Sequence, residues 1–349
     1  MMTIEEIELA CERNLPLDFT RHDLEVPELL LRETFYPLGF PVELRTNSAE
    51  ILAQAHELWS VFGQSFETEP IRVDVHVVDV DHGNEEASEG AESCPPAPVF
   101  RMMQPLLISI ADVNNYSIAD LERRRTQIVI TRTTERHKNY LGYFFLGGAA
   151  LCHVATRYTT PVHGACVALE GRGVLLCGDS GAGKSTLAYA CARAGWTYIT
   201  DDATFILNEH LAAGGGRLAT GNCHQVRFRP SATEFFPEIA GLEITPRAAG
   251  KPSIELPTAP MKSLTCAQTV QIDYLVFLNR RVPHPPHLRP YSKEVARQYL
   301  RQVLYGSASS LSEQYVSLER LLTAEVFELR YSDLDWAIDR LQTLVREGC

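Results

Sequence analysis

The stretch GDSGAGKS, Gly178–Ser185, constrains what this chain can fold into more than any other feature of the sequence. It follows the short apolar run GVLLC (173–177) and precedes TLAYACARAG (186–195), which has the character of a helix that ends at a glycine. Strand, glycine-rich loop and helix in this order predict an α/β domain whose loop binds an anion. Glycines let the backbone N–H groups turn inward, and the helix N-terminus adds positive partial charge.

The pattern G-x-x-x-x-G-K-[ST] also predicts the ligand, a nucleoside triphosphate. We expect Lys184 to reach its outer phosphates and the hydroxyl of Ser185 to hold Mg²⁺. ATP and Mg²⁺ are therefore the expected cofactors. The residues expected to bind the nucleotide are Gly178, Asp179, Ser180, Gly181, Ala182, Gly183, Lys184, Ser185 and Thr186.

Two adjacent acids, Asp201 and Asp202, lie 17 residues beyond Lys184, at the end of the apolar run WTYIT (196–200). If GVLLC and WTYIT are neighbouring parallel strands joined by the helix, their carboxyl ends open at the same sheet edge and the acids face the loop. One carboxylate would then hold the metal, and the other would accept a proton from an attacking hydroxyl. The sequence leaves open which aspartate takes which role.

The overall charge restricts the partners. The chain has 349 residues and a net charge of -12, with no basic block interleaved with aromatics. We therefore expect no broad surface for nucleic acid or an anionic membrane, although a local basic pocket is compatible with this balance. The nine cysteines are odd in number and include no C-x-x-C pair, which is typical of thiols in a reducing compartment. The acidic N-terminus lacks the features of a signal peptide, so we predict a cytoplasmic protein.

An uncharged stretch of 18 residues, NYLGYFFLGGAALCHVAT (139–156), approaches the length of a membrane span. It also contains polar residues and three glycines. Because it leads directly into the loop region, we predict a helix buried against a sheet.

The remaining patterns divide the chain into two predicted domains. Alternating strands at 40–46, 71–80, 106–113 and 126–133, with a helix at 48–63, predict a small α+β domain over residues 1–136. The segment 81–98, rich in acids, Gly, Ser and Pro, is expected to be a flexible acidic loop within it. Residues 137–349 form the predicted nucleotide-binding domain. Amphipathic helices are expected at 292–304 and 332–348.

Residues 161–205 resemble the catalytic domain of the bacterial HPr kinase/phosphorylase family. The shared features are His163-Gly164 before an apolar strand, GDSGAGKS, and the doublet in YITDD so soon after the loop. The compact arrangement is also similar to phosphoenolpyruvate carboxykinases. The resemblance implies a P-loop kinase domain of the HPr kinase/phosphoenolpyruvate carboxykinase type, with Asp201, Asp202, His163 and Lys184 at the catalytic centre and Ser185, Asp201 and Asp202 as metal ligands. The alternative for His163 alone is an ordinary polar residue.

The sequence departs from this family in two places. Thr186 stands where an acid commonly follows the loop serine, and the downstream signature E-[IV]-R-G-[LI]-G is absent. We therefore expect a divergent branch without phosphorylase activity. Arg227, Arg229 and Lys251 are candidates for contacts to phosphate or substrate, since cations stabilise the charge of phosphoryl transfer. Ordinary surface cations are the alternative.

Three functions are compatible with these patterns. The leading hypothesis is an ATP- and Mg²⁺-dependent kinase of a hydroxyl, a serine of a protein or peptide of unknown identity. A nucleotide-sensing module with little turnover and a kinase of a small-molecule hydroxyl are the alternatives. The sequence leaves open the acceptor, the reversibility of transfer and the role of the N-terminal domain. The family resemblance implies a homo-oligomer.

Overall fold

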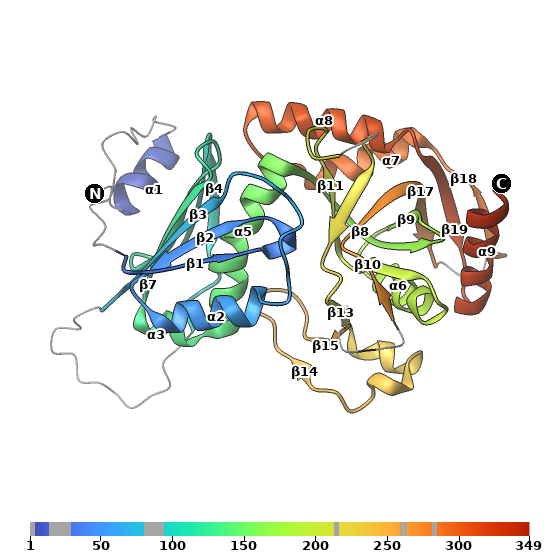
Figure 1. Ribbon diagram of the computed structural model, residues 1–349, viewed down its shortest axis with the longest axis horizontal. Helices are drawn as coiled ribbons and strands as arrows, with labels where there is room; N and C mark the ends of the chain where they lie inside the picture. The colour runs from blue at the N-terminus through green and yellow to red at the C-terminus, as the bar shows by residue number, and fades with distance from the viewer. Residues whose placement is uncertain are drawn as a thin grey trace. The chain divides into compact units, whose positions relative to one another are not determined.

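The computed structural model describes residues 4–13, 29–79, 94–212, 216–258, 261, 264–280 and 285–348. The chain divides into a first unit, Met1–Val154, and a second unit, Ala155–Cys349, each built on a β-sheet with helices (Figure 1). Within the described ranges, no helix is both long and apolar enough to cross a membrane.

The first unit is built on a seven-stranded mixed sheet with the order β1-β2-β3-β7-β6-β5-β4. Strands β2, β3 and β7 run parallel, and the other neighbours pair antiparallel. The strands are β1 Leu31–Phe35, β2 Val42–Thr46, β3 Ile71–Val78, β4 Val99–Met103, β5 Leu106–Asp112, β6 Asn115–Asp120 and β7 Arg125–Thr131.

The helices of the first unit are α1 Ile4–Arg13, the 3-10 helix η2 Pro37–Gly39, α2 Ala49–Trp59, α3 Arg132–Arg136, α4 Lys138–Tyr140, the π-helix η3 Leu141–Gly147 and α5 Gly148–His153. Helix α2 begins at an N-cap, Ser48, whose hydroxyl accepts a hydrogen bond from the backbone N–H of Glu50. Ionic contacts to one buried acid also join strands of this sheet. The carboxylate of Asp74 accepts two hydrogen bonds from the Arg45 guanidinium at 2.6 and 2.7 Å and one from Arg125 at 3.2 Å.

The strands and the helix predicted for the first unit are confirmed at β2, α2, β3, β5 and β7. The sequence did not predict β1, β4 or β6. The uncharged stretch is the buried helix expected, but η3 and α5 belong to the first unit, where α5 packs on β3 and β6. The two compact units divide after Val154, whereas the sequence placed the domain boundary after Arg136, because this apolar helix packs on the sheet that precedes it. Most of the predicted acidic loop at 81–98 lies outside the described residues.

The second unit contains a nine-stranded sheet in which β8, β9, β17, β12 and β11 pair in a closed ring. Its strands are β8 Thr159–Leu169, β9 Arg172–Cys177, β10 Thr197–Thr200, β11 Ala203–Leu207, β12 Leu218–Gly221, β16 Thr265–Cys266, β17 Thr269–Asn279, β18 His287–Pro290 and β19 Glu325–Arg330. A separate three-stranded sheet has the order β13-β15-β14, with β13 Gln225–Phe228, β14 Ile244–Thr245 and β15 Ser253–Pro257.

Helices cover both faces of the larger sheet (Figure 1). They are the π-helix η4 Val154–Tyr158, α6 Lys184–Arg193, α7 Lys293–Leu300, α8 Ala308–Leu321 and α9 Leu334–Glu347, with 3-10 turns η5 Pro230–Glu234, η6 Pro237–Ile239 and η7 Arg301–Val303. Along β9, Val174 and Leu176 share a core with α6 and α9, whereas Leu175 and Cys177 share a core with α7 and α8. Burial on both faces explains why this strand is a continuous apolar run.

Strands β9 and β10 are parallel, as assumed from the sequence. They are not neighbours in the sheet, although the sequence analysis assumed that they are. Strand β8 lies between them and pairs antiparallel with both. The prediction was wrong because β8 precedes β9 directly and pairs with it through the tight turn at Glu170 and Gly171. The carboxyl ends of β9 and β10 still open at one edge, with the middle of β8 between them.

Candidate functional site

The glycine-rich loop, residues 178–185, joins the carboxyl end of β9 to the N-terminus of α6. Three of its glycines have left-handed backbone angles, with φ values of 141° at Gly178, 90° at Gly181 and 97° at Gly183. A Cβ at Gly183 would lie 2.8 Å from the hydroxyl oxygen of Tyr331, which leaves no room for a side chain. The loop therefore needs glycine both for its curl and for its packing.

Lys184, the first residue of α6, is buried under this loop. Its ammonium group donates hydrogen bonds to the carbonyl oxygens of Gly178 at 2.7 Å and Asp179 at 3.3 Å. Burial lowers the pKa of Lys184, and the negative charge of Asp202 opposes that effect. The lysine is thus held at the helix N-terminus, where it adds a full charge to the partial charge of the helix.

Strand β8 brings His163 and Gly164 between the loop and the acids. The backbone N–H of Gly164 donates to the carbonyl of Asp202 at 3.0 Å, and His163 pairs in register with Ala203. The Nδ1 atom of His163 lies 3.6 Å from the Oδ1 atom of Asp202. Burial and the positive charge of Lys184 lower the pKa of His163, against the influence of Asp202. Lys184, His163 and Asp202 are therefore close enough to affect one another's charge.

The two aspartates lie in different environments. Asp202 is 59% exposed at its side chain, whereas Asp201 is 6% exposed. The Oδ2 atom of Asp201 accepts a hydrogen bond from the backbone N–H of Arg227 at 2.9 Å, which ties the acid to strand β13. Burial raises the pKa of Asp201 to about 6, while the hydrogen bond from the Arg227 N–H acts in the opposite direction.

The loop serine lies beside this doublet. The Ser185 hydroxyl donates to the backbone carbonyl of Asp201 at 3.4 Å. A hydroxyl and the exposed carboxylate of Asp202 are hard oxygen ligands of the kind that Mg²⁺ prefers. The described part of the chain has no cluster of three or more His, Cys, Asp or Glu that could hold a metal ion. These residues therefore fit Mg²⁺ bound jointly by protein and phosphate oxygens, and they do not fit a metal enclosed by protein ligands.

The predicted cations differ in where they lie. Arg229, which directly follows β13, donates a hydrogen bond to the hydroxyl of Ser180 in the loop at 2.7 Å. The Arg227 side chain is bound elsewhere, with its Nε atom 3.3 Å from a carboxylate oxygen of Glu255. Lys251 is exposed and forms no hydrogen bond or ion pair with any described residue, so nothing connects it to the loop.

Sequence reasoning missed Tyr299, on α7. Its hydroxyl lies 3.1 Å from the amide nitrogen of Gly178, 2.8 Å from the Gly178 carbonyl oxygen and 3.0 Å from the carbonyl oxygen of His163. Burial raises the pKa of Tyr299 to about 12, so the hydroxyl keeps its proton. It joins the loop to strand β8. No local motif marks this residue, because only the packing of α7 on the sheet brings it to the loop.

Two more residues that sequence reasoning missed, Arg280 and Tyr331, contact the loop at Gly183. Each follows the last residue of a strand parallel to β9, namely β17 and β19. Their position directly after apolar runs was the only signal in the sequence.

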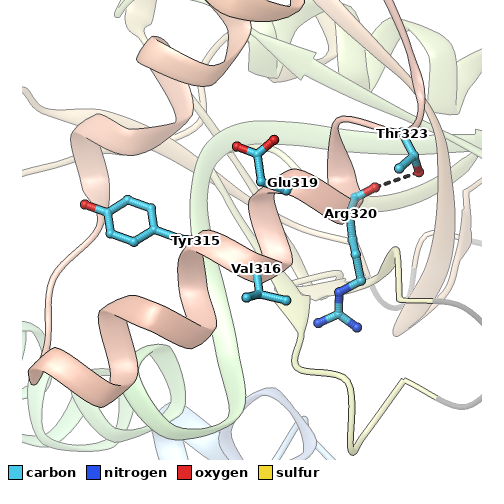
Figure 2. Close-up of a pocket in the computed structure, with 5 residues that line it drawn as sticks. All are labelled: Tyr315, Val316, Glu319, Arg320 and Thr323. Carbon is cyan, nitrogen blue, oxygen red and sulfur yellow. Dashed lines mark hydrogen bonds between the residues drawn. The ribbon is translucent and has the colours of Figure 1, made fainter.

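A shallow depression lies apart from the loop residues, on helix α8. It is lined by Tyr315, Val316, Glu319, Arg320 and Thr323 (Figure 2). The Thr323 hydroxyl donates to the Arg320 carbonyl at 2.7 Å, which closes the end of the helix. No residue of the loop or of the acidic doublet lines this depression, so the candidate site remains the edge of the sheet around the loop.

Comparisons with known proteins give little further information. No family model matches the chain, and no curated protein matches it. Among solved structures, the HPr(Ser) kinase/phosphatase of Coxiella burnetii is similar with a TM-score of 0.29 and 12% identity, over 54% of this chain and 94% of that one. A similarity this low supports no functional conclusion, so the function is inferred from the geometry of the site.

Proposed function

We propose that this protein is an ATP- and Mg²⁺-dependent kinase that transfers a phosphoryl group to a hydroxyl, a serine of a protein or peptide. The observation that carries the proposal is the convergence of Lys184, Asp202 and His163 at one glycine-rich loop. The loop would supply backbone N–H groups and a helix N-terminus for phosphate, and the exposed carboxylate would supply a base. The loop, the lysine and the carboxylate each have a role in phosphoryl transfer, and the fold itself does not require that they lie together.

The two aspartates would then have different roles. Asp202 is exposed and lies beside His163, so it is the residue that can accept a proton from an incoming hydroxyl. Because its pKa is lowered, His163 is neutral at neutral pH and leaves the negative charge of Asp202 available. Asp201 would act as a positioning residue that fixes β13, and with it Arg229, against the loop.

Lys184, Ser185 and Arg229 would hold the phosphates and the metal. Lys184 would exchange its hydrogen bonds to loop carbonyls for bonds to phosphate oxygens, which are stronger because both partners are charged. Mg²⁺, when bound by Ser185 and an acid of the doublet, supplies charge neutralisation on the transferred group. We place the chain in a divergent branch of the HPr-kinase-like proteins, without phosphorylase activity.

The test is phosphoryl transfer from γ-labelled ATP to proteins and peptides of a cell lysate, with and without Mg²⁺. Wild type should label an acceptor, and Asp202→Asn should lose labelling while its melting temperature stays unchanged, because this side chain is exposed. Lys184→Ala should lose ATP binding itself. Asp339→Asn, an exposed acid on α9, is the matched control and should label like wild type.

Each outcome decides between the hypotheses. Labelling by Asp202→Asn equal to that of wild type would remove this residue as the base. Tight ATP binding by wild type without transfer to any acceptor would favour the nucleotide-sensing module. Label found only in small molecules by mass spectrometry would identify a metabolite kinase acting through the same site.

A further inference from the structure

Arg280 and Tyr331 lie at the same sheet edge as the glycine-rich loop. Strand β17 runs parallel to β9, with Phe277 opposite Cys177, and parallel to β19, with Asn279 opposite Arg330. The residues that directly follow these strands, Arg280 and Tyr331, therefore emerge beside the loop that follows β9.

Both side chains contact the loop at Gly183, the residue before the buried lysine. A Cβ at Gly183 would lie 2.8 Å from the Tyr331 hydroxyl and 3.1 and 3.4 Å from the Cδ and Nη1 atoms of Arg280. The Arg280 guanidinium lies over two aromatic rings, 5.6 Å from the centre of Tyr331 and 5.4 Å from that of Phe235. These contacts fix the position of the guanidinium.

Neither polar group has a partner among the residues that the structure describes. The Tyr331 hydroxyl is buried, with the residue 2% exposed, and it makes no hydrogen bond within the described part of the chain. Arg280 makes no hydrogen bond or ion pair with any residue that the structure describes. Buried polar groups are normally hydrogen-bonded, because leaving them without a partner costs free energy. Tyr331 is such a buried donor, and the half-buried Arg280 lies beside it at the glycine-rich loop, which indicates that a ligand supplies their acceptor.

An arginine that stacks on an aromatic ring can also pair with a carboxylate, and Arg193 of the same unit does both. Arg193 lies over the ring of Phe236 at 5.7 Å, and its Nη1 atom is also 3.0 Å from a carboxylate oxygen of Glu238. Around the loop, by contrast, Arg229 donates to a serine hydroxyl and Arg280 has no carboxylate partner among the described residues. In a chain with a net charge of -12, carboxylates are not scarce.

We propose that Arg280 and Tyr331 bind a phosphate group of the ligand held by the loop, on the side of Gly183. This inference rests on the proposed function only in taking a nucleoside polyphosphate as the ligand. A planar guanidinium donates two parallel hydrogen bonds to phosphate oxygens, and the tyrosine hydroxyl donates a third. The aromatic rings hold the guanidinium in place before the ligand arrives, which reduces the entropy lost on binding.

The test measures the affinity of the full chain for ATP and for inorganic tripolyphosphate by calorimetry, in the presence of Mg²⁺. Arg280→Gln should weaken the binding of both by about tenfold or more, since a charged bidentate contact is lost. Tyr331→Phe, which keeps the ring, should weaken both by about threefold to tenfold. Arg193→Gln is the matched control and should bind both like wild type.

The outcomes separate this inference from the proposed function. If wild type binds neither compound, the proposed function fails. If wild type binds both, and Arg280→Gln and Tyr331→Phe bind within twofold of it, the inference fails and the proposed function stands. A loss seen with ATP but not with tripolyphosphate would assign the pair to the nucleoside and overturn the phosphate contact. Should Arg280→Gln not fold, Arg280→Lys decides, because wild-type affinity with a lysine would exclude the bidentate contact.

Discussion

The buried carboxyl of Asp201 predicts that replacing this acid stabilises the second unit at neutral pH. Folding raises the pKa of Asp201 from the ordinary value of 3.8 to about 6, chiefly through burial. The folded state therefore binds this proton more tightly than the unfolded state does. The stability that Asp201 contributes is fully present below pH 3.8 and is lost as the pH rises through about 6.

The magnitude follows from this pKa difference. One pKa unit corresponds to about 1.4 kcal/mol, so ionised Asp201 lowers the free energy of unfolding by roughly 3 kcal/mol relative to its protonated form. Asp201→Asn removes this charge. The amide oxygen of the new asparagine can still accept the hydrogen bond from the Arg227 N–H. The Tyr198 hydroxyl donates its proton to the Gln225 carbonyl, so its oxygen can accept a hydrogen bond from the asparagine N–H₂ group. The variant should be more stable than wild type at neutral pH, by about 1 to 3 kcal/mol.

The assay is urea unfolding followed by tryptophan fluorescence, in a chelating buffer that removes divalent metal. A Trp59→Phe background leaves only Trp196 and Trp336, both in the second unit, as reporters. From pH 7.5 to pH 5, the free energy of unfolding of the Asp201 protein should rise by roughly 1 kcal/mol relative to the Asp201→Asn protein. Asp202→Asn should reduce this rise without abolishing it, because the neighbouring charge of Asp202 contributes to raising the pKa of Asp201, after burial.

Parallel pH profiles for the Asp201 and Asp201→Asn proteins would refute the reasoning, because they would mean that folding does not change the affinity of this carboxyl for its proton. A loss of stability at neutral pH would equally contradict it. In that case the charged hydrogen bond to β13 would outweigh the cost of burying the charge. If the prediction holds, the chain retains an acid at a position where an amide is more stable, which is expected of a site selected for function.

Three further changes test other parts of the structure. Tyr299→Phe should weaken ATP binding about threefold to tenfold in calorimetry with little change in melting temperature, because the loop loses its hydroxyl tie at Gly178; unchanged affinity would show that the tie is dispensable. Gly183→Ala should abolish ATP binding, since the new Cβ would clash and the backbone angle is left-handed, and retained binding would contradict the observed loop conformation. Asp74→Asn should lower the free energy of unfolding of the first unit by about 2 to 4 kcal/mol in urea, because it leaves Arg45 without its buried partner; a change below 1 kcal/mol would show that the pair is replaceable.

The parts of the fold that depend on local patterns could be predicted from the sequence. Alternation predicted β2, β3, β5 and β7, and helical spacing predicted α2, α7 and α9. The glycine-rich loop also fixed the order of β9 and α6. The short or exposed strands β1 and β4 were missed, because their alternation extends over too few residues to be distinguished from a loop.

The pairing of strands was harder to predict than their existence. The neighbours of β9 depend on whether the preceding strand turns back on it. The residues Glu170 and Gly171, both with positive φ, make that turn, and nothing in the apolar runs specifies it. The error moved β10 one strand further from β9. It left the functional expectation intact, because two strands separated by one antiparallel strand still point the same way.

Arg280 and Tyr331 were missed for the same physical reason. Their position also explains how an acidic chain can bind a polyanion. Arg280 and Tyr331 lie 95 and 146 residues beyond Ser185, the end of the loop, and only the parallel pairing of β9, β17 and β19 brings them together. Charges farther than about 8 to 10 Å from a ligand are screened by physiological salt, so the net charge of -12 says little about a site with its own cations. A useful rule follows for such chains. After a phosphate loop is found, a cation that directly follows any later strand of the same parallel set should be treated as a candidate for the site, since the carboxyl ends of those strands meet at one edge.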